Sequence, residues 1–529
     1  MLIDGASARD RMRLKADICI IGAGVAGITL ANELKAHSLK VVVLESGGDS
    51  YDEKIQELNE AEKADGLHPD PLYSRLRVLG GTSNHWLNNA IPFSKIDFEK
   101  RAWIENSGWP ISYGDVEKYY PKAGEYCGVD ADGYDPEYWL KRLGLESPFS
   151  RSGIIQTKIA KAARPPTRFF QKYGPDLERS DRIDIYKHAS LVDVVFDKKT
   201  KQIREASFTS DGKIVHSIVA DTFILCMGGI ENARMLLHFN MKYENALGNQ
   251  HDNVGRYFMD HPTVRPASVF TTSPELAKDR SASLGERNIG LNFEYSEGTL
   301  RDHKITNAKL FFFNSNNYDL SDGISSFHIL KDNLIKGELP DDAFTHLSNL
   351  IFDIDMVAEA ISRKSFNKRI FPHAEDLAGF GVHVMMEQTP SRNNRVKLGQ
   401  AKDRLGLRKV LIDWTLEQRD IDMMWSGLLL LGKEFGLHSL GRLRLLKEQS
   451  ERMFADQMGF GHHHMGTTRM AADERTGVVD RNQLVFGTAN LYVAGSSVFT
   501  TGSHVPPTLT IVALSLRLAD HLAMKRAKR

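Results

Sequence analysis

One stretch near the start of the chain, residues 16–48, constrains the fold more than any other part of the sequence. It reads ADICIIGAGVAGITLANELKAHSLKVVVLESGG. An apolar run ends in Gly22, Gly24 and Gly27, a helical pattern continues to Leu34, and a second apolar run ends at Glu45. The pattern predicts a strand, a tight turn, a helix and a second strand.

Each part of this unit suits a dinucleotide. Gly22 permits the sharp turn, Gly24 lets a pyrophosphate approach the backbone, and Gly27 lets helix and strand pack closely. Free N–H groups at the helix start attract phosphate. Glu45 can accept hydrogen bonds from a ribose hydroxyl, which argues against a 2′-phosphate and is compatible with NAD or FAD. A glycine-rich turn that binds no ligand is the alternative.

A second glycine pair, Gly80 and Gly81, precedes the polar residues TSNH. Glycine frees the backbone for close approach to a ligand, so we expect a second cofactor contact that includes Thr82, Asn84 and His85. Near the C-terminus, the segment NLYVAGSSVFTTGSHVPPTLTIVALSLRLADHL predicts an apolar strand, a loop and a long helix opened by proline.

The middle of the chain has a different texture. Residues 183–227 read as short strands of an antiparallel meander, and IENARMLLHF reads as the helix that follows. Between about 265 and 450 the sequence is irregular and rich in aromatic residues, with amphipathic helices predicted near 343–362 and 418–436. We interpret this region as a substrate lobe.

Composition excludes several classes of protein. The 529 residues exceed what one hydrophobic core usually supports. Lysine plus arginine equals aspartate plus glutamate, 68 each, with no basic stripe of the kind that binds nucleic acid. No apolar run could cross a bilayer and no signal peptide is apparent. Cys19, Cys127 and Cys226 are too widely spaced for a CxxC or zinc pattern. We expect a soluble, cytoplasmic protein.

Several motifs, in a fixed order, cover essentially the whole chain. They are IGAGVAGITLANEL with VVVLESG, GGTSNHW, SGWPIS, GGIENARMLL, VGRYFMDHP, HHMGTTRM, VVDRNQLVFGTANLYVAGSS and PPTLTIVALSLRLADHL. In these motifs the chain resembles the glucose–methanol–choline (GMC) oxidoreductases, which oxidise alcohols and sugars with FAD. It is most similar to the branch of pyranose oxidases, glucoside 3-dehydrogenases and C-glycoside oxidases.

The resemblance implies an α/β fold with two interleaved domains. A Rossmann-like FAD-binding domain would take residues 1–95, 183–264 and 451–529. A substrate-binding domain, an antiparallel sheet with helices, would take 96–182 and 265–450, with a lid or arm near 310–375. The resemblance adds Val192, Gly495, Pro507 and Thr508 to the cofactor-binding residues. In the family the helix that begins near Pro507 points at the flavin, where its N-terminus stabilises negative charge on the reduced ring.

Histidine 85 raises a separate question about the cofactor. GGTSNHW resembles the segment in which some pyranose oxidases attach FAD covalently through histidine. Many relatives share the motif without that bond, so we favour a noncovalent role for His85 at the isoalloxazine and leave the covalent bond open.

Three adjacent histidines, His462, His463 and His464, suit proton transfer better than metal binding. In an extended segment the outer two point away from the middle one, and no nearby acidic or cysteine ligand completes a coordination sphere, so we expect no metal. Imidazole can accept a hydroxyl proton at neutral pH. The position of the family's catalytic histidine falls on His463, or on His462 if the loop carries an extra residue.

The second catalytic position of the family, commonly Asn or His, is occupied by Pro506, which offers no side-chain hydrogen bond. His504 is the candidate replacement, and an ordinary loop histidine is the alternative.

Together these residues predict oxidation of a secondary alcohol, at carbon 2 or carbon 3 of a pyranose or glycoside, to a keto-sugar. Oxygen, a quinone or a separate electron-accepting protein would reoxidise the flavin, and a homo-oligomer is left open. The rivals are oxidation of a nonsugar alcohol, a lyase that keeps FAD without reducing it, a pyridine-nucleotide-dependent flavoenzyme, and a nonenzymatic flavin-binding protein. The third is weakened because a second GxGxxG unit and a CxxxxC pair are missing.

Overall fold

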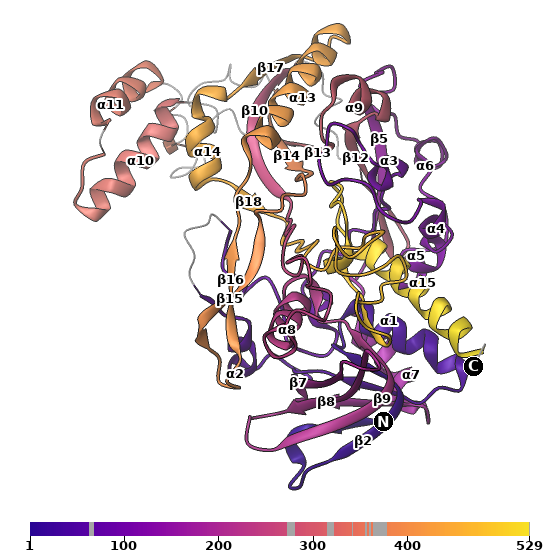
Figure 1. The fold of residues 1–529 in the computed structure, drawn as a ribbon. Helices are drawn as coiled ribbons and strands as arrows, with labels where there is room; N and C mark the ends of the chain where they lie inside the picture. The colour runs from indigo at the N-terminus through magenta and orange to yellow at the C-terminus, as the bar shows by residue number, and fades with distance from the viewer. Residues whose placement is uncertain are drawn as a thin grey trace.

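Two large β-sheets organise the molecule, one below the other in Figure 1. The structure is a computed structural model that describes residues 1–62, 68–271, 281–314, 322–340, 342–354, 357–358, 361–362 and 378–527. The lower sheet has the order β1-β6-β3-β2-β9-β8-β7, with β19 paired to β9. Its strands are β1 (Leu2–Asp4), β2 (Arg13–Ile21), β3 (Val41–Leu44), β6 (Ile183–Lys187), β7 (Ser190–Asp197), β8 (Gln202–Thr209), β9 (Val215–Leu225) and β19 (Leu491–Val493).

The lower sheet confirms the βαβ unit predicted from the glycine motif. Strands β2 and β3 pair in parallel, and α1 (Val25–Leu34) connects them. Strand β3 and residues 18–21 of β2 are apolar and fully buried, as expected where helices cover the sheet, and α15 (Thr508–Ala527) lies against α1 there (Figure 1). The other helices of this region are α7 (Phe169–Arg179) and α8 (Gly228–Tyr243).

One detail of the predicted meander is wrong. Only β7, β8 and β9 form antiparallel pairs, whereas β6 pairs in parallel with both β1 and β3. The sequence of β6 alternates charged and apolar residues like its neighbours, and the direction of its pairing depends on the N-terminal strand more than 180 positions away.

The upper sheet is antiparallel, with the order β11-β12-β13-β14-β10-β17, and β5 and β18 pair with β12 and β10. The strands are β5 (Ile155–Ala163), β10 (Pro262–Thr271), β11 (Ser281–Leu284), β12 (Arg287–Tyr295), β13 (Ala308–Asn314), β14 (Ala378–Met386), β17 (Arg442–Leu445) and β18 (Gly459–Phe460). One face of this sheet carries apolar residues such as Leu310 and Val384, which share a core with Leu428 of the predicted helix α13 (Gln418–Leu437).

The opposite face of the upper sheet is polar. Phe293 and Leu310 are paired residues of the apolar face, so their chain neighbours Glu294 and Lys309 point the other way. Lys158 contacts Glu294 from β5. A buried ion pair between Glu294 and His504, which lies between β19 and α15, shows that this polar face looks toward the lower sheet.

A third, smaller sheet and further helices complete the described fold. A third sheet has the order β15 (Arg395–Lys402), β16 (Arg408–Asp413) and β4 (Ala61–Glu62). The other helices are α2 (Glu53–Gln56), α3 (Lys95–Phe98), α4 (Gly114–Glu117), α5 (Tyr120–Tyr126), α6 (Pro136–Leu143), α9 (Glu297–His303), α10 (Asp322–Lys336), α11 (Ala343–Phe352) and α14 (Ser450–Asp456). The 3₁₀ helices are η1 (Gly5–Ser7), η2 (Lys35–His37), η3 (Glu57–Asn59), η4 (Gly81–Asn84), η8 (Lys447–Gln449) and η9 (Ser496–Val498).

Helices α10 and α11 project from the upper sheet as a hairpin (Figure 1). Helix α11 forms the first part of the helix predicted at 343–362. Most of the expected lid or arm beyond residue 354 lies outside the described residues. Large apolar side chains of the hairpin, among them Phe344 and Phe352, are exposed.

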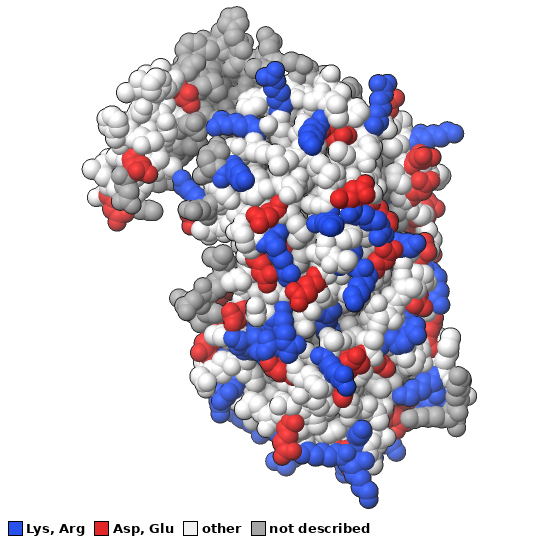
Figure 2. All heavy atoms as spheres, turned by 45° about the horizontal axis from the view of Figure 1, so that its top comes forward, with Lys and Arg blue, Asp and Glu red and all other residues white. Residues whose placement is uncertain are grey.

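The charged side chains agree with the balanced composition. In Figure 2, lysine and arginine are interspersed with aspartate and glutamate over the visible face, without a large area of one sign. Among the described helices, none combines the length and the apolar character needed to cross a bilayer.

Candidate active site

Each of the three glycines in the turn after β2 has a different structural role. Gly22 has φ +106°, and a Cβ there would lie 2.6 Å from the carbonyl oxygen of Cys226. A Cβ on Gly27 would lie 1.9 Å from the carbonyl oxygen of Gly22. A Cβ on Gly24 would meet no described atom within 4 Å, so the backbone is open to a ligand at this point.

The segment that carries Gly80 to His85 packs against this turn. The backbone N–H of Gly80 donates to the carbonyl of Ala23 at 2.9 Å. Asn84 donates its amide to the carbonyls of Leu79 and Gly81, at 3.0 and 2.8 Å, so this side chain stabilises its own 3₁₀ turn. Thr82 and His85 are exposed.

Glu45 follows the last residue of β3 and is buried. Its carboxylate accepts hydrogen bonds from the backbone N–H groups of Ala23 and Gly47, both at 2.8 Å. Burial raises the pKa of Glu45, and these hydrogen bonds oppose that shift. Val192 lies in a β-bulge of β7, and Ala189, the residue before this strand, donates its backbone N–H to the carbonyl of Glu45 at 2.7 Å.

These residues fit the adenine-dinucleotide part of FAD. The backbone at Gly24 is open, the start of α1 has no side-chain cap, and the Glu45 carboxylate lies beside the turn with lone pairs available.

The C-terminal segment brings a second helix start to this region. Helix α15 begins at Thr508, and the carbonyl of Pro507 accepts from Ile511 at 2.9 Å, so Pro507 precedes the helix by one residue. Gly495 has φ +105° after β19, and a Cβ there would meet no described atom within 4 Å. The N–H groups at the start of α15 suit a developing negative charge.

The histidine at the centre of the predicted site contacts another imidazole. The Nδ1 atoms of His463 and His261 lie 2.8 Å apart. The Nε2 atom of His261 lies 3.2 and 3.0 Å from the carbonyl oxygens of Gly502 and Ser503. A carbonyl only accepts, so Nε2 of His261 carries a proton and, in the neutral ring, Nδ1 accepts. His463 therefore donates from Nδ1, which leaves its Nε2 lone pair free.

A buried carboxylate holds both histidines in place. One oxygen of Asp260 accepts the backbone N–H groups of His261 and His463, each at 2.7 Å. Burial, with a smaller contribution from His261, lowers the pKa of His463 to about 3, so this imidazole is neutral. Sequence reasoning did not single out Asp260 and His261, although both stand in the VGRYFMDHP motif as adjacent polar residues after an aromatic stretch.

The other two histidines of the triplet do not behave as an extended segment predicts. His462 is exposed and has the left-handed φ of +55°. The pKa of His85 is lowered, chiefly by burial and to a smaller extent by the charges of Arg168 and His462. His464 is buried, with Nε2 3.9 Å from a carboxylate oxygen of Asp260. The expectation that no acidic residue lies near the triplet is therefore wrong, because Asp260 is distant in sequence and adjacent in space.

His504 is buried and lies beside a carboxylate. Its Nε2 lies 2.7 Å from Oε2 of Glu294. Glu294 also accepts from Gln156 at 2.6 Å and lies 3.5 Å from Lys158. Burial alone would raise the pKa of Glu294, but Lys158 and His504 lower it to about 2. His504 is thus tied to the polar face of the upper sheet, and Pro506 beside it supplies no side-chain hydrogen bond.

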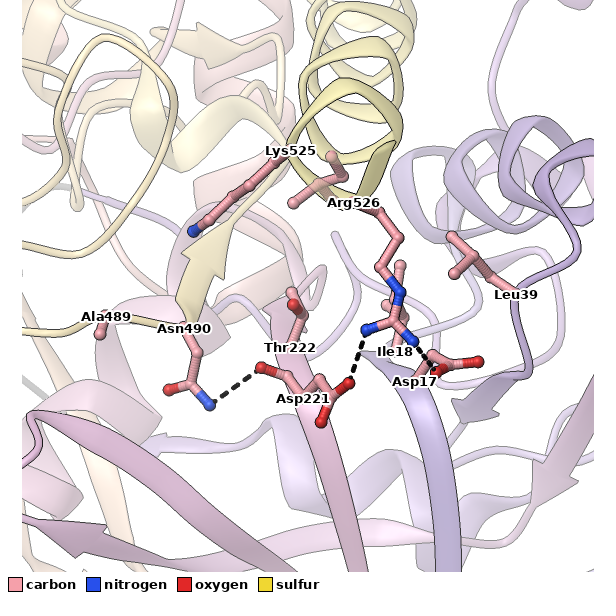
Figure 3. Close-up of a pocket in the computed structure, with 10 residues that line it drawn as sticks. Asp17, Ile18, Leu39, Asp221, Thr222, Ala489, Asn490, Lys525 and Arg526 are labelled. Carbon is pink, nitrogen blue, oxygen red and sulfur yellow. Dashed lines mark hydrogen bonds and ion pairs between the residues drawn. The ribbon is translucent and has the colours of Figure 1, made fainter. Parts of the chain in front are cut away.

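A surface hollow elsewhere in the molecule is a poor candidate for the chemistry (Figure 3). It lies near the beginnings of β3 and β19 and the end of α15, on the side of the lower sheet away from the glycine turn. Arg526 reaches both Asp17 and Asp221 at 2.8 Å across it. Its lining contains none of the histidines described above.

Comparisons with known proteins agree with this geometry. Residues 390–515 match the family model described as GMC oxidoreductase. The chain is 31% identical over 585 residues to the paromamine 6′-oxidase of Streptomyces fradiae, covering 98% of this chain and 93% of that protein. Over 125 residues it is 34% identical to the C-glycoside 3-oxidase of Microbacterium trichothecenolyticum, covering 23% of this chain and 22% of that protein. Among solved structures, the pyridoxine 4-oxidase from Mesorbium loti superposes with a TM-score of 0.59 at 14% identity, covering 96% of this chain and 98% of that one, which supports the fold alone.

Proposed function

Because this chain belongs to the GMC oxidoreductase family and is an enzyme that oxidises CH–OH groups, we propose that it oxidises a secondary alcohol of a pyranose sugar or glycoside, at carbon 2 or carbon 3, to a keto-sugar, with FAD as cofactor. The relatives named as a paromamine oxidase and a C-glycoside oxidase act on sugar-containing molecules by name, which supports this substrate class. Oxygen, a quinone or a separate protein would be the second acceptor.

The residues that would hold FAD come from four segments. The turn at Gly22, Gly24 and Gly27, with Glu45 and Val192, would hold the adenosine diphosphate. Gly80, Gly81 and the TSNH residues, together with Gly495 and the start of α15 at Pro507 and Thr508, would hold the flavin. FAD, when bound, supplies the acceptor for the hydride that leaves the substrate carbon.

The contact between His261 and His463 carries the proposal for proton removal. It leaves Nε2 of His463 unprotonated, and that nitrogen accepts the hydroxyl proton of the substrate while the hydride leaves the adjacent carbon. Asp260 fixes the backbone on which both imidazoles depend. His462 remains the alternative base, and His504 remains the candidate for the second catalytic position.

The polar face of the upper sheet supports a sugar rather than an apolar alcohol. Lys309 is buried, burial lowers its pKa to about 8, and its charge acts on His463. Lys309 and Thr263 share Met385 as cross-strand partner, so they lie in one row on the same face. That row continues to Gly459 of β18, three residues before His462. Donors and acceptors here match a ligand with several hydroxyl groups.

The domain division is also part of this proposal. Residues 1–95, 183–264 and 451–529 would form the FAD-binding domain, and residues 96–182 and 265–450 the substrate-binding domain. The strands of the lower sheet all come from the first set of ranges, and most strands of the upper sheet come from the second.

The test is anaerobic mixing of the purified flavoprotein with pyranoses and glycosides, including glucose and an aryl C-glucoside, while the visible absorption of the flavin is recorded. We expect one sugar to bleach the flavin. Colour that returns on admission of air indicates an oxidase, and persistent bleaching indicates a dehydrogenase. If benzyl alcohol bleaches the flavin and no sugar does, the nonsugar alternative replaces the proposal. If a known lyase substrate is turned over without bleaching, the lyase alternative replaces the proposal.

The variant His463→Ala tests the assignment of the base. It should retain bound flavin and slow reduction by substrate about 10²–10⁴-fold. Normal reduction in His463→Ala with slow reduction in His462→Ala would move the base to His462.

A further inference from the structure

Behind the catalytic histidine, three side chains converge in the interior. His68, Asp260 and His464 are 1%, 0% and 6% exposed. Nε2 of His68 lies 3.2 Å from Oδ2 of Asp260, and Nε2 of His464 lies 3.9 Å from the same oxygen. All three ligand atoms lie within 4.8 Å of one another.

The protons of this cluster do not account for its contacts if both rings are neutral. Nδ1 of His68 lies 2.9 Å from the carbonyl oxygen of Pro69 and must donate to it. Nε2 of a neutral His68 is then a lone pair facing a carboxylate oxygen, which is repulsive. A proton or a metal cation is therefore required between the two atoms.

The hydrogen bonds around the cluster favour the cation. Histidines that bind metals usually donate their other N–H to a carbonyl or carboxylate, as His68 does to Pro69. Carboxylates that bind metals are themselves hydrogen-bonded, and the second oxygen of Asp260 accepts from two backbone N–H groups. The rings of Phe258, Trp414 and Phe460 surround His68 edge-on, with centroids 5.0–5.8 Å away, and form an apolar shell.

We propose that His68, Asp260 and His464 bind one divalent cation of the first transition row, with Zn²⁺ the best match. Tetrahedral ligands about 2.0–2.1 Å from zinc are about 3.3 Å apart, close to the 3.2 Å between His68 and Asp260. The imidazole of His464 would move closer by about 1 Å. Its Nε2 lies 3.4 Å from the hydroxyl of Ser74, which places a polar group at the fourth position.

The cation would have a structural role. It would join the segment at His68 to the start of β10 and to the loop that carries His463. The site has one carboxylate and two neutral imidazoles, a donor set typical of zinc and of ferrous iron. None of the three ligands exchanges electrons, and the oxidation of the alcohol does not depend on the site for any atom or electron.

The first test is the metal content of the purified flavoprotein, measured by plasma mass spectrometry after exchange into metal-free buffer. We expect about one zinc or iron per chain in the wild type and in His251→Gln, which changes an exposed histidine. We expect less than about a tenth of that in His68→Gln. Wild type without metal, and unable to take up Zn²⁺ on titration, would overturn the proposal in favour of a histidinium–carboxylate pair.

A second measurement does not depend on the variant folding. Co²⁺ added to chelator-treated wild type should produce ligand-field absorption at wavelengths longer than the flavin band, and Zn²⁺ should remove it. Zn²⁺ should also raise the thermal midpoint of this protein by several degrees, because it binds only the folded chain. Co²⁺ that remains spectroscopically octahedral and shifts no midpoint would exclude a protein-bound site.

Discussion

At the scale of single residues, the contact between His261 and His463 assigns one proton to a definite nitrogen. Two carbonyls fix the proton on the far side of His261, and the near side then accepts from His463. This arrangement uses a neutral imidazole where other enzymes use a carboxylate to orient a catalytic histidine. A neutral partner leaves the proposed base uncharged, which suits a buried site.

We expect His261→Leu to slow flavin reduction by about 10²-fold, since nothing then holds the tautomer of His463. His261→Asn should recover most of that loss, because its amide oxygen can accept from Nδ1 and its NH₂ group can donate to a carbonyl. The measurement is anaerobic stopped-flow reduction, with flavin content and thermal midpoint as controls. Equal loss in both variants, with folding intact, would show that the imidazole acts in another way.

The exposed side chain of His85 can be tested without kinetics. Precipitation of the protein with acid should leave the yellow colour in the supernatant, as expected for noncovalent FAD. Colour that stays in the pellet of the wild type and moves to the supernatant in His85→Ala would instead establish a covalent bond at this residue.

Residues with local signals were predictable, and residues paired across the sequence were not. Gly22, Gly24 and Glu45 follow from spacing within one βαβ unit. Asp260 and His261 were missed because they stand 202 positions and more from the histidines they hold. The pairing of β18 with β10 brings them together, and the two-residue strand β18 carries no sequence signal for that partner.

At the scale of elements, helix α13 contains a carboxylate in an unusual state. Asp420, in the first turn of the helix, accepts from the backbone N–H of Thr389 at 3.1 Å, and its other oxygen has no partner among the described residues. Burial raises the pKa of Asp420 to about 6. The folded protein therefore holds this proton more tightly than the unfolded chain, for which the pKa is about 3.9.

The stability that this proton contributes is fully present below pH ~4 and is lost as pH rises through about 6. We expect Asp420→Asn to raise the free energy of unfolding at pH 8 by at most about 3 kcal/mol, and the thermal midpoint with it. At pH 4 the substitution should change both little. The matched control is Asp422→Asn, an exposed residue of the same helix. A gain at pH 4 as large as that at pH 8 would contradict the assigned proton.

Elements with a strong period or a helix signal were predicted well. The strands β2 and β3 and the helices α1, α8, α13 and α15 lie where the sequence places them. The order of strands in the upper sheet was not predictable, because β5 pairs with β12 more than 120 positions later and no turn connects them.

At the scale of the whole molecule, Glu294 links the two large sheets. It belongs to the upper sheet and pairs with His504 from the loop between β19 of the lower sheet and α15, while Lys158 and Gln156 complete its contacts. The depressed pKa of this carboxyl, about 2, means that the ion pair stabilises the fold above pH ~4.5 and that this contribution is lost as pH falls through about 2.

We expect Glu294→Gln to lower the free energy of unfolding at pH 7 by about 3 kcal/mol, and the thermal midpoint with it, because the substitution leaves buried positive charge without a partner. At pH 3 the difference from wild type should shrink. Glu244→Gln, which removes an exposed pair with Lys198, should leave the thermal midpoint nearly unchanged at both pH values. An equal effect of the two variants would mean that Glu294 is solvated in solution.

The strand order of the lower sheet also determines how late in synthesis the sheet can be completed. Its first strand begins at Leu2, but β19 starts only at Leu491, and α15 packs on α1 after that. A ribosome must therefore add almost all of the chain before the sheet is complete, whereas the upper sheet needs residues only to Phe460. During this interval the apolar residues of β2 and β3 lack part of the structure that covers them. Chaperones that shield such strands should therefore affect the yield of active protein.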